Sequence, residues 1–320
     1  MVDKLIKNKG GLHNRITNQI YLRPFNLKEC EEYLDTHHFN WDRYQILECY
    51  MILGGIPYYL SLLNPEKSLA QNVDYLFYRK NAILRNEFDE LYNALFINAE
   101  HYITVVKALS EKKSGMTREE IKERTGLNGG SLSKILQNLE KCDFIISYSN
   151  YKNAVKNSLY KLIDFYTLFY YNFITGNNSK DEEFWTHHLN LPTVNTWRGN
   201  TFELVSLMHL DMIKQKLGIS GLATAAYSWR SRDPENAAQI DLLIDRADRI
   251  FNVCEMKFSH EPYSITKEYE TKLRNRLAYF KSETKTTKGL SMTFVTTYGV
   301  LPNKHSGIVQ NEVMMDDLFE

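Results

Sequence analysis

Residues that break helices or bend strands are scarce in this chain. Of its 320 residues, 15 are Gly and 7 are Pro, which favours many helices over an all-β chain with frequent turns. The four cysteines never occur as a Cys-x-x-Cys pair, and this excludes a zinc ribbon and a thioredoxin-like site. Single scattered cysteines are typical of a reducing compartment.

Long apolar segments are also missing. The longest uncharged stretches, CYMILGGIPYYLSLLNP and FYTLFYYNFITGNNS, are shorter than the roughly 18 residues that a membrane-spanning helix needs. The N-terminus, MVDKLIKNKGG, lacks the apolar run of a signal peptide. We therefore expect a soluble, cytoplasmic protein with no membrane partner.

Neither sign of charge is in excess. The chain has 39 Lys and Arg against 39 Asp and Glu, which excludes a strongly basic nucleic-acid wrapper and an acidic disordered tail. A local basic face remains possible. At roughly 150 residues per domain, the length suggests two domains or three small ones.

The first part of the chain combines one strand-like pattern with several helical ones. Residues 16–25, ITNQIYLRPF, alternate polar and apolar side chains and predict a single strand. Residues 26–98 have helical periodicity, and Asn26 with Glu29 predicts a capping box at the start of the first helix. We interpret residues 1–98 as one unit, a strand followed by a helical region.

Residues 99–164 have the element order of a winged helix-turn-helix. Three helical patterns, the second beginning at a capping box of Thr117 and Glu120, precede the strand-like runs FIISYSN and SLYKLID. The third helix of this fold enters the DNA major groove and the wing contacts phosphates. A spacer or protein-interaction role is the alternative. The residues expected to contact DNA are Ser131, Ser133, Lys134, Gln137 and Asn138 on the third helix and Lys152 and Lys156 in the wing.

Residues 165–320 have an α/β pattern. The order is one helix (WRGNTFELVSLMHLDMIKQKLG), three strands (AAYSWRS, QIDLLID, IFNVCEMKF), an amphipathic helix and a further strand (LSMTFVTTYGV). Leu204, Leu207, Met208 and Met212 are expected to form the buried face of the first helix. The fold class is therefore α+β multidomain, with units at 1–98, 99–164 and 165–320.

Four side chains of this last unit are candidates for a hydrolytic site. Glu255 and Lys257 share one strand face, and the tight turn RADR places Asp241 nearly opposite Glu255. Glu203 lies among apolar residues in the upstream helix, where a carboxylate needs a partner or a metal. Carboxylates bind Mg²⁺ or Mn²⁺, which polarises a phosphodiester, and Lys257 would orient or deprotonate water or neutralise charge. A surface salt bridge to Lys257 is the alternative.

Residues of about 197–298 resemble the PD-(D/E)XK nuclease superfamily, whose core is helix, three strands, helix and strand. The resemblance implies that Glu203, Asp241 and Glu255 ligate Mg²⁺ and that Lys257 assists the attacking water. Gln239 is a further candidate in that family's pattern. The proline that names the motif is absent.

The whole chain resembles the C-terminal two-thirds of a prokaryotic AAA+/STAND-like ATPase family. The segments GGLHNRITNQIYLRPFNLKECEEYL, LGGIPYYL and IDLLIDRADRIFNVCEMKFS carry this resemblance together with the winged helix. It implies a helical lid-like region, a winged helix and a nuclease-like domain. Since no G-x-x-x-x-G-K-[ST] occurs, we expect no ATP site and a shortened relative or fragment.

The function that these resemblances imply is Mg²⁺-dependent cleavage of DNA. The alternative is a non-catalytic DNA-binding or regulatory remnant of the ATPase family. DNA is the expected partner, and an ATPase partner or a second copy of the chain is possible.

Overall fold

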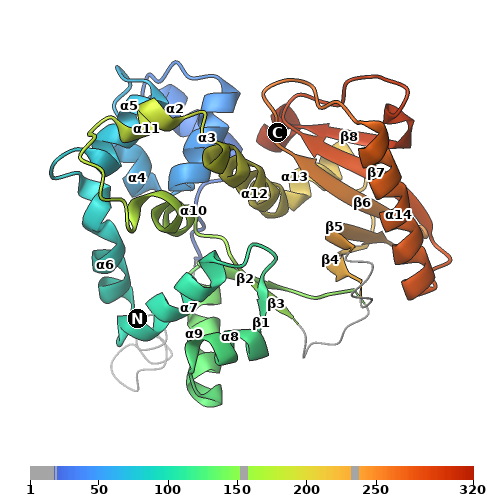
Figure 1. The fold of residues 1–320 in the computed structure, drawn as a ribbon, viewed down its shortest axis with the longest axis horizontal. Coiled ribbons are helices and arrows are strands. Elements are labelled where there is room, and N and C mark those ends of the chain that lie inside the picture. Colours follow the sequence, from blue (N-terminus) through green and yellow to red (C-terminus); the bar gives the residue numbers. More distant parts are fainter. Residues whose placement is uncertain (1–17, 19, 152–157, 232–237) are drawn as a thin grey trace.

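A computed structural model of the chain describes residues 18, 20–151, 158–231 and 238–320. These residues form a mixed α and β structure with 13 α-helices, a three-stranded sheet and a five-stranded sheet. In Figure 1 most early helices gather on one side and the five-stranded sheet lies on the other, with α12 between them. None of the described helices is both long and apolar enough to cross a membrane.

The first region is helical, as predicted. Capping boxes form at Asn26 with Glu29 and at Asp42 with Gln45, so the side chains satisfy backbone N–H groups that the helix leaves free. Gly54, at φ 66°, ends the second helix. The elements are α2 (Leu27–Thr36), α3 (Arg43–Leu53), α4 (Pro57–Ser61), α5 (Leu69–Val73), the π-helical turn η1 (Asp74–Tyr78) and α6 (Ile83–Leu95).

The strand predicted for residues 16–25 is wrong in its described part, where the backbone is irregular. Phe25 N–H donates to the Gly55 carbonyl at 2.7 Å, and the Tyr21 hydroxyl donates to the Lys141 carbonyl at 3.0 Å. A strand needs a neighbour with which to form a ladder. The alternating pattern is therefore not sufficient to make this segment extended.

The middle region has three helices followed by two strands, in the predicted order. The capping box of Thr117 and Glu120 forms. A short strand that the sequence analysis did not predict joins the hairpin, and the antiparallel sheet has the order β1-β3-β2. The elements are α7 (Ala99–Ser110), β1 (Met116–Thr117), α8 (Arg118–Thr125), α9 (Gly129–Lys141), β2 (Ile145–Tyr148) and β3 (Leu159–Leu162).

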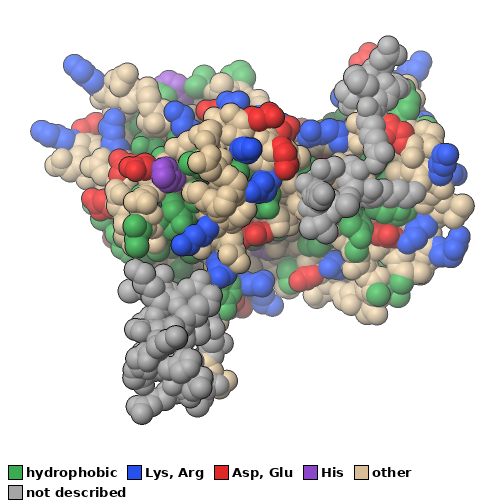
Figure 2. All heavy atoms as spheres, turned by 90° about the horizontal axis from the view of Figure 1, so that it is seen from below, with side chains coloured by type: hydrophobic (Ala, Val, Ile, Leu, Met, Phe, Trp, Pro, Cys, Tyr) green, Lys and Arg blue, Asp and Glu red, His purple; other side chains and the backbone are tan. Residues whose placement is uncertain are grey.

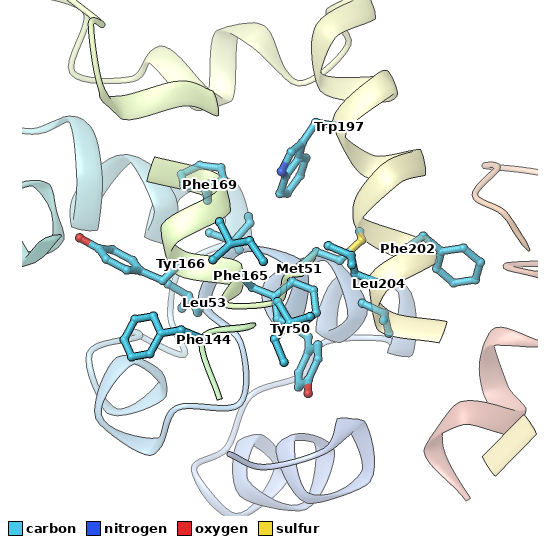
Figure 3. Close-up of a cluster of buried hydrophobic side chains, with 14 of the residues drawn as sticks. Tyr50, Met51, Leu53, Phe144, Phe165, Tyr166, Phe169, Trp197, Phe202 and Leu204 are labelled. Carbon is cyan, nitrogen blue, oxygen red and sulfur yellow. The ribbon is translucent and has the colours of Figure 1, made fainter. Parts of the chain in front are cut away.

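An aromatic segment follows and packs back onto the first region. Figure 3 shows Phe165, Tyr166 and Phe169 in a cluster with side chains of α3 and with Trp197 and Phe202. Burial of these large rings provides much of the hydrophobic stabilisation of the helical part. The elements are α10 (Phe165–Phe169), the π-helical turn η3 (Tyr170–Ile174) and α11 (Phe184–His188).

The last region has the predicted order of helix, three strands, helix and strand, followed by one further strand. Strands β4, β5 and β6 are antiparallel, whereas β6, β7 and β8 are parallel. The elements are α12 (Pro192–Met208), α13 (Leu210–Lys216), β4 (Thr224–Arg230), β5 (Gln239–Arg246), β6 (Ile250–Lys257), α14 (Lys267–Thr284), β7 (Gly289–Thr296), η4 (Ser306–Ile308), β8 (Asn311–Met314) and η5 (Met315–Phe319).

The single helix predicted around Glu203 is instead two helices that meet at His209. The buried His209 ring donates from Nδ1 to the Val205 carbonyl at 2.8 Å, and its Nε2 accepts from Leu27 N–H at 3.0 Å. This contact with the start of α2 fixes the bend. The predicted apolar face is correspondingly wrong at Met208, which is 41% exposed, while Phe202 and Val205 are fully buried.

Two apolar layers cover the five-stranded sheet. The face toward α14 contains Leu243, Phe251 and Val253, whereas Leu242 and Cys254 belong to the core on the opposite face. Glu255 and Lys257 continue the α14 side of β6 because side chains alternate along a strand.

Candidate functional site

Glu255 is the most completely paired of the candidate residues. It is 9% exposed, and its Oε1 lies 2.8 Å from Lys257 Nζ and accepts from the Tyr269 hydroxyl, while Oε2 pairs with Arg276. Tyr269 and Arg276 are seven residues apart, or about two helical turns, and so share one face of α14. Both oxygens of the carboxylate are therefore occupied.

This pairing sets the charge states on the α14 face. Burial tends to raise the pKa of Glu255, but Lys257 and Arg276 outweigh burial and lower it below the ordinary value of 4.5. Burial tends to lower the pKa of Lys257, but Glu255 raises it. Lys257 is therefore an ammonium at neutral pH, which suits it to neutralise an anion and not to deprotonate water.

Glu203 is in a different electrostatic situation. It is half-buried on α12, and this burial together with the charge of Asp241 raises the pKa of Glu203 to about 7, against the opposing effect of Lys161. Asp241 accepts a hydrogen bond from Gln239 Nε2 at 2.6 Å. Glu203 and Asp241 thus repel each other, and the lysine nearby only partly compensates.

A β-bulge determines the position of Asp241. The pairing of β5 with β4 shifts register between Tyr227 and Trp229, and the ladder with β6 ends at Leu242 and Cys254. Asp241 and Glu255 were predicted to be opposite each other. They are the next residues after the last pair of the β5–β6 ladder, so they are not themselves paired. A bulge re-aims side chains in this way and is frequent beside functional sites.

Asp241 is within electrostatic reach of side chains from two different elements. Burial is the largest cause of the raised pKa of Tyr148, and Asp241 is the strongest charge acting on it. For Arg276, burial lowers the pKa, Glu255 raises it, and Asp241 adds to the rise. Asp241 therefore acts electrostatically on the hairpin residue Tyr148 and on Arg276 of α14.

The residues fit a divalent cation only in part. Among the residues that the structure describes, no three His, Cys, Asp or Glu side chains are placed to hold one metal ion. Glu255 does not fit such a site in this arrangement because its oxygens are paired with Lys257, Arg276 and Tyr269. Glu203 and Asp241 do fit, because a cation between them would relieve their repulsion.

Two further buried oxygen atoms lie where β4 faces the bulge that contains Asp241. Asn150 forms a β-bridge with Ser228 of β4, next to the bulge, and joins the three-stranded sheet to the five-stranded one. Asn150 Oδ1 and Ser228 Oγ are buried without a hydrogen-bond partner. Buried oxygens are normally paired, so these two are free to accept a water or a hard cation.

The sequence analysis missed four residues of this site. Tyr269 and Arg276 had a usable signal, because their spacing places both on one helical face toward the predicted strand. Tyr148 and Lys161 had no such signal in the sequence, because they come near Glu203 only through the packing of the hairpin against α12.

Only some of the residues predicted to contact DNA are exposed in the structure. On α9, Ser133, Lys134 and Gln137 are exposed, whereas Asn138 is half-buried and donates to the Tyr102 hydroxyl at 2.7 Å. An amide held in this way is poorly placed to read a base. Lys152 and Lys156 lie outside the described residues.

The exposed side of α9 borders a surface hollow of about 500 Å³, which Arg118, Lys134, Gln137 and Glu140 line with others. In Figure 2 basic and acidic side chains are interspersed over one face of the molecule. Contact with DNA on such a surface would depend on a few cations and not on a broad basic patch.

No protein-family model, curated protein or solved structure matches the chain. Function must therefore be inferred from the contacts described above.

Proposed function

We propose that the chain is a Mg²⁺-dependent, nuclease-like protein that hydrolyses DNA phosphodiesters at Glu203, Asp241, Glu255 and Lys257. The observation that carries the proposal is the only partly compensated pair of Glu203 and Asp241: burial and the charge of Asp241 together raise the pKa of Glu203 to about 7. Oxygen ligands of this kind suit Mg²⁺ or Mn²⁺. A bound ion would polarise a phosphodiester and lower the pKa of its water.

The chain's own residues would take distinct roles. Glu203 and Asp241 would hold the cation, with the unpartnered oxygens of Asn150 and Ser228 accepting from its waters. Lys257 would neutralise charge on the phosphate. Glu255, which pairs with Arg276 and accepts from Tyr269, would position Lys257. It would ligate the cation only after Arg276 moves away.

The element order supports a corresponding interpretation of the fold. We interpret 1–98 as a helical lid-like region, 99–164 as a winged helix and 165–320 as a PD-(D/E)XK nuclease-like domain, in a relative of AAA+/STAND-like ATPases that lacks the P-loop. Three helices followed by a hairpin support the second unit, and one helix, three strands, one helix and a strand support the third.

The test is cleavage of plasmid DNA by the purified chain with Mg²⁺ or Mn²⁺, compared with Asp241→Ala and with excess EDTA. We expect cleavage by the wild type and a loss of at least 100-fold in the variant, consistent with removal of a charged group that acts in the transition state. Asp211→Ala, at an exposed carboxylate outside the site, is the matched control and should cleave normally. Equal behaviour of the wild type and Asp241→Ala, with no metal binding by calorimetry, would reject the proposal.

The complete pairing of Glu255 favours a second candidate, a non-catalytic DNA-binding or regulatory protein on the same scaffold. Such a protein would bind duplex DNA with an affinity that falls steeply with salt, without cleavage. Fluorescence anisotropy of Lys134→Ala, with the exposed Lys107→Ala of α7 as control, tests whether α9 provides the contact. Unchanged binding by Lys134→Ala would argue against α9.

A further inference from the structure

A small cavity lies beside Glu203, where the end of α7 and strand β3 meet α10 and α12. Its volume is about 50 Å³, and Lys112, Lys113, Lys161, Trp197, Asn200 and Glu203 contribute to its lining. One water requires roughly 10–15 Å³ measured in this way. The space is therefore large enough for a group of about four oxygen atoms and too small for a nucleotide base.

Lys161 is the unusual residue of this cavity. It is only 6% exposed, and it forms no ion pair with any residue in the described part of the chain. Its ammonium lies 6.0 Å from the centre of the Tyr148 ring, and Glu203 is the acidic group that it influences. Burying an ammonium without a close counter-ion is costly, so an anion that enters the cavity would be bound favourably.

Other hydrogen-bond donors line the same space. Trp197 is 5% exposed, and its Nε1 is buried with no acceptor within hydrogen-bond distance. Asn200, whose amide nitrogen donates one N–H to the Thr196 carbonyl and has a second, and the exposed Lys113 also contribute to the wall, while Lys112 is already paired with Glu120 at 2.5 Å. Buried donors usually have an acceptor, and a ligand rich in acceptor oxygens would supply it.

We propose that this cavity binds the dianion of a phosphate monoester, with Lys161 as its principal cation. A tetrahedral phosphate has oxygens on every side and can accept from an ammonium, an indole N–H and an amide at once. A monoester ends in the phosphate, so its terminal group fits a small, partly open space that is too narrow for a continuous diester strand. The ligand is a strand-terminal phosphate or a free phosphate, which share this chemistry.

The first test is calorimetric titration of the full chain with inorganic phosphate, without divalent metal. We expect binding by the wild type and at least a tenfold loss in Lys161→Met, which keeps the buried stem but removes the charge. Lys107→Met, on the exposed side of α7, should bind as the wild type does. Thermal unfolding of both variants checks that they are folded.

The second test identifies the source of the phosphate. Oligonucleotides with a 5′-phosphate, with a 3′-phosphate or with neither compete against inorganic phosphate. Stronger competition by one phosphorylated oligonucleotide indicates a strand end, and equal competition by phosphate alone indicates a free ligand. The proposal is overturned if the wild type does not bind phosphate, if Lys161→Met binds equally well, or if the unphosphorylated oligonucleotide competes best.

These readouts are independent of cleavage. Asp241→Ala should still bind phosphate, because Asp241 does not line the cavity. A chain that binds phosphate through Lys161 without cutting DNA would therefore contradict the proposed nuclease activity and leave the phosphate site intact.

Discussion

Two glutamates of this protein, the buried Glu255 and the half-buried Glu203, are in opposite electrostatic environments. Glu255 has two cations and a phenol around it, and its pKa is lowered. Glu203 is half-buried, and burial together with the charge of Asp241 raises its pKa to about 7. Since an isolated Glu titrates near 4.3, the native fold stabilises the charged form of one carboxylate and penalises that of the other.

Glu203 should therefore make stability depend on pH. A raised folded pKa favours the native state below the unfolded pKa, and this advantage is lost as pH rises from about 4.5 to about 7. Glu203→Gln removes the charge, so we expect its free energy of unfolding at pH 8 to exceed that of the wild type by about 2–3 kcal/mol. Urea unfolding at pH 5 and pH 8 measures the difference, which should shrink at the lower pH and when Mg²⁺ is added.

Glu255 should behave in the opposite way. Glu255→Gln leaves Lys257 and Arg276 without a buried counter-ion, and removing one member of such a network lowers the free energy of unfolding by about 3 kcal/mol. Chemical denaturation at pH 7 measures the loss. Glu268→Gln, at an exposed carboxylate of the same helix, should change stability little. Equal effects of the two substitutions would contradict a structural role for the Glu255 network.

At the scale of secondary-structure elements, the end of α3 shows how closely the backbone segments pack. Gly54 has φ 66°, a left-handed conformation that suits glycine. A Cβ placed on Gly55 would lie 1.9 Å from the carbonyl oxygen of Phe25. The segment that precedes α2 is therefore held against the end of α3 by backbone contact.

Gly55→Ala should consequently destabilise the protein by about 2 kcal/mol or more, because one of the two backbone segments must move. Gly130→Ala, in the first turn of α9, meets nothing within 4 Å and should leave stability equal or slightly higher, since Ala favours helix over Gly. Thermal unfolding of both variants provides the comparison. A stable Gly55→Ala protein would show that the contact is not maintained in solution.

At the scale of the whole molecule, three contacts join regions that are far apart in the sequence. Arg198 of α12 pairs with Glu48 of α3 at 2.5 Å, and the Tyr44 hydroxyl lies 2.8 Å from His260 Nδ1. Tyr151 N–H donates to the Ser228 carbonyl at 2.8 Å. The helical region is thus attached to α12 and to the segment after β6, and the segment after β2 is attached to β4.

Tyr151 offers the simplest test of the hairpin junction. Its ring packs against Tyr227, Phe251 and Phe280 on the α14 face of the sheet. Tyr151→Ala should lower the free energy of unfolding by about 1–2 kcal/mol, less than for a fully buried ring. Tyr75→Ala, at a ring that is 49% exposed, is the control. If the hairpin shapes the site, Tyr151→Ala should also reduce metal and phosphate binding, whereas Tyr75→Ala should not.

The element order and many helix starts followed from local patterns in the chain. Capping boxes at Asn26 and Thr117, and the apolar alternation of QIDLLID and IFNVCEMKF, depend on residues a few positions apart. Local interactions of this kind are readable without knowing the fold. Glu203, Asp241, Glu255 and Lys257 could be selected for the same reason, as charged groups within apolar segments.

Long-range contacts decided the rest. The bulge at Asp241, the break at His209 and the occupation of Glu255 by Arg276 all depend on partners brought together by packing. The same is true of Lys161, which becomes a buried cation only when the hairpin meets α12. Periodicity predicts which residues are buried, but it does not predict which side chains contact them. Those contacts determine the protonation state and the chemistry of a buried charged group.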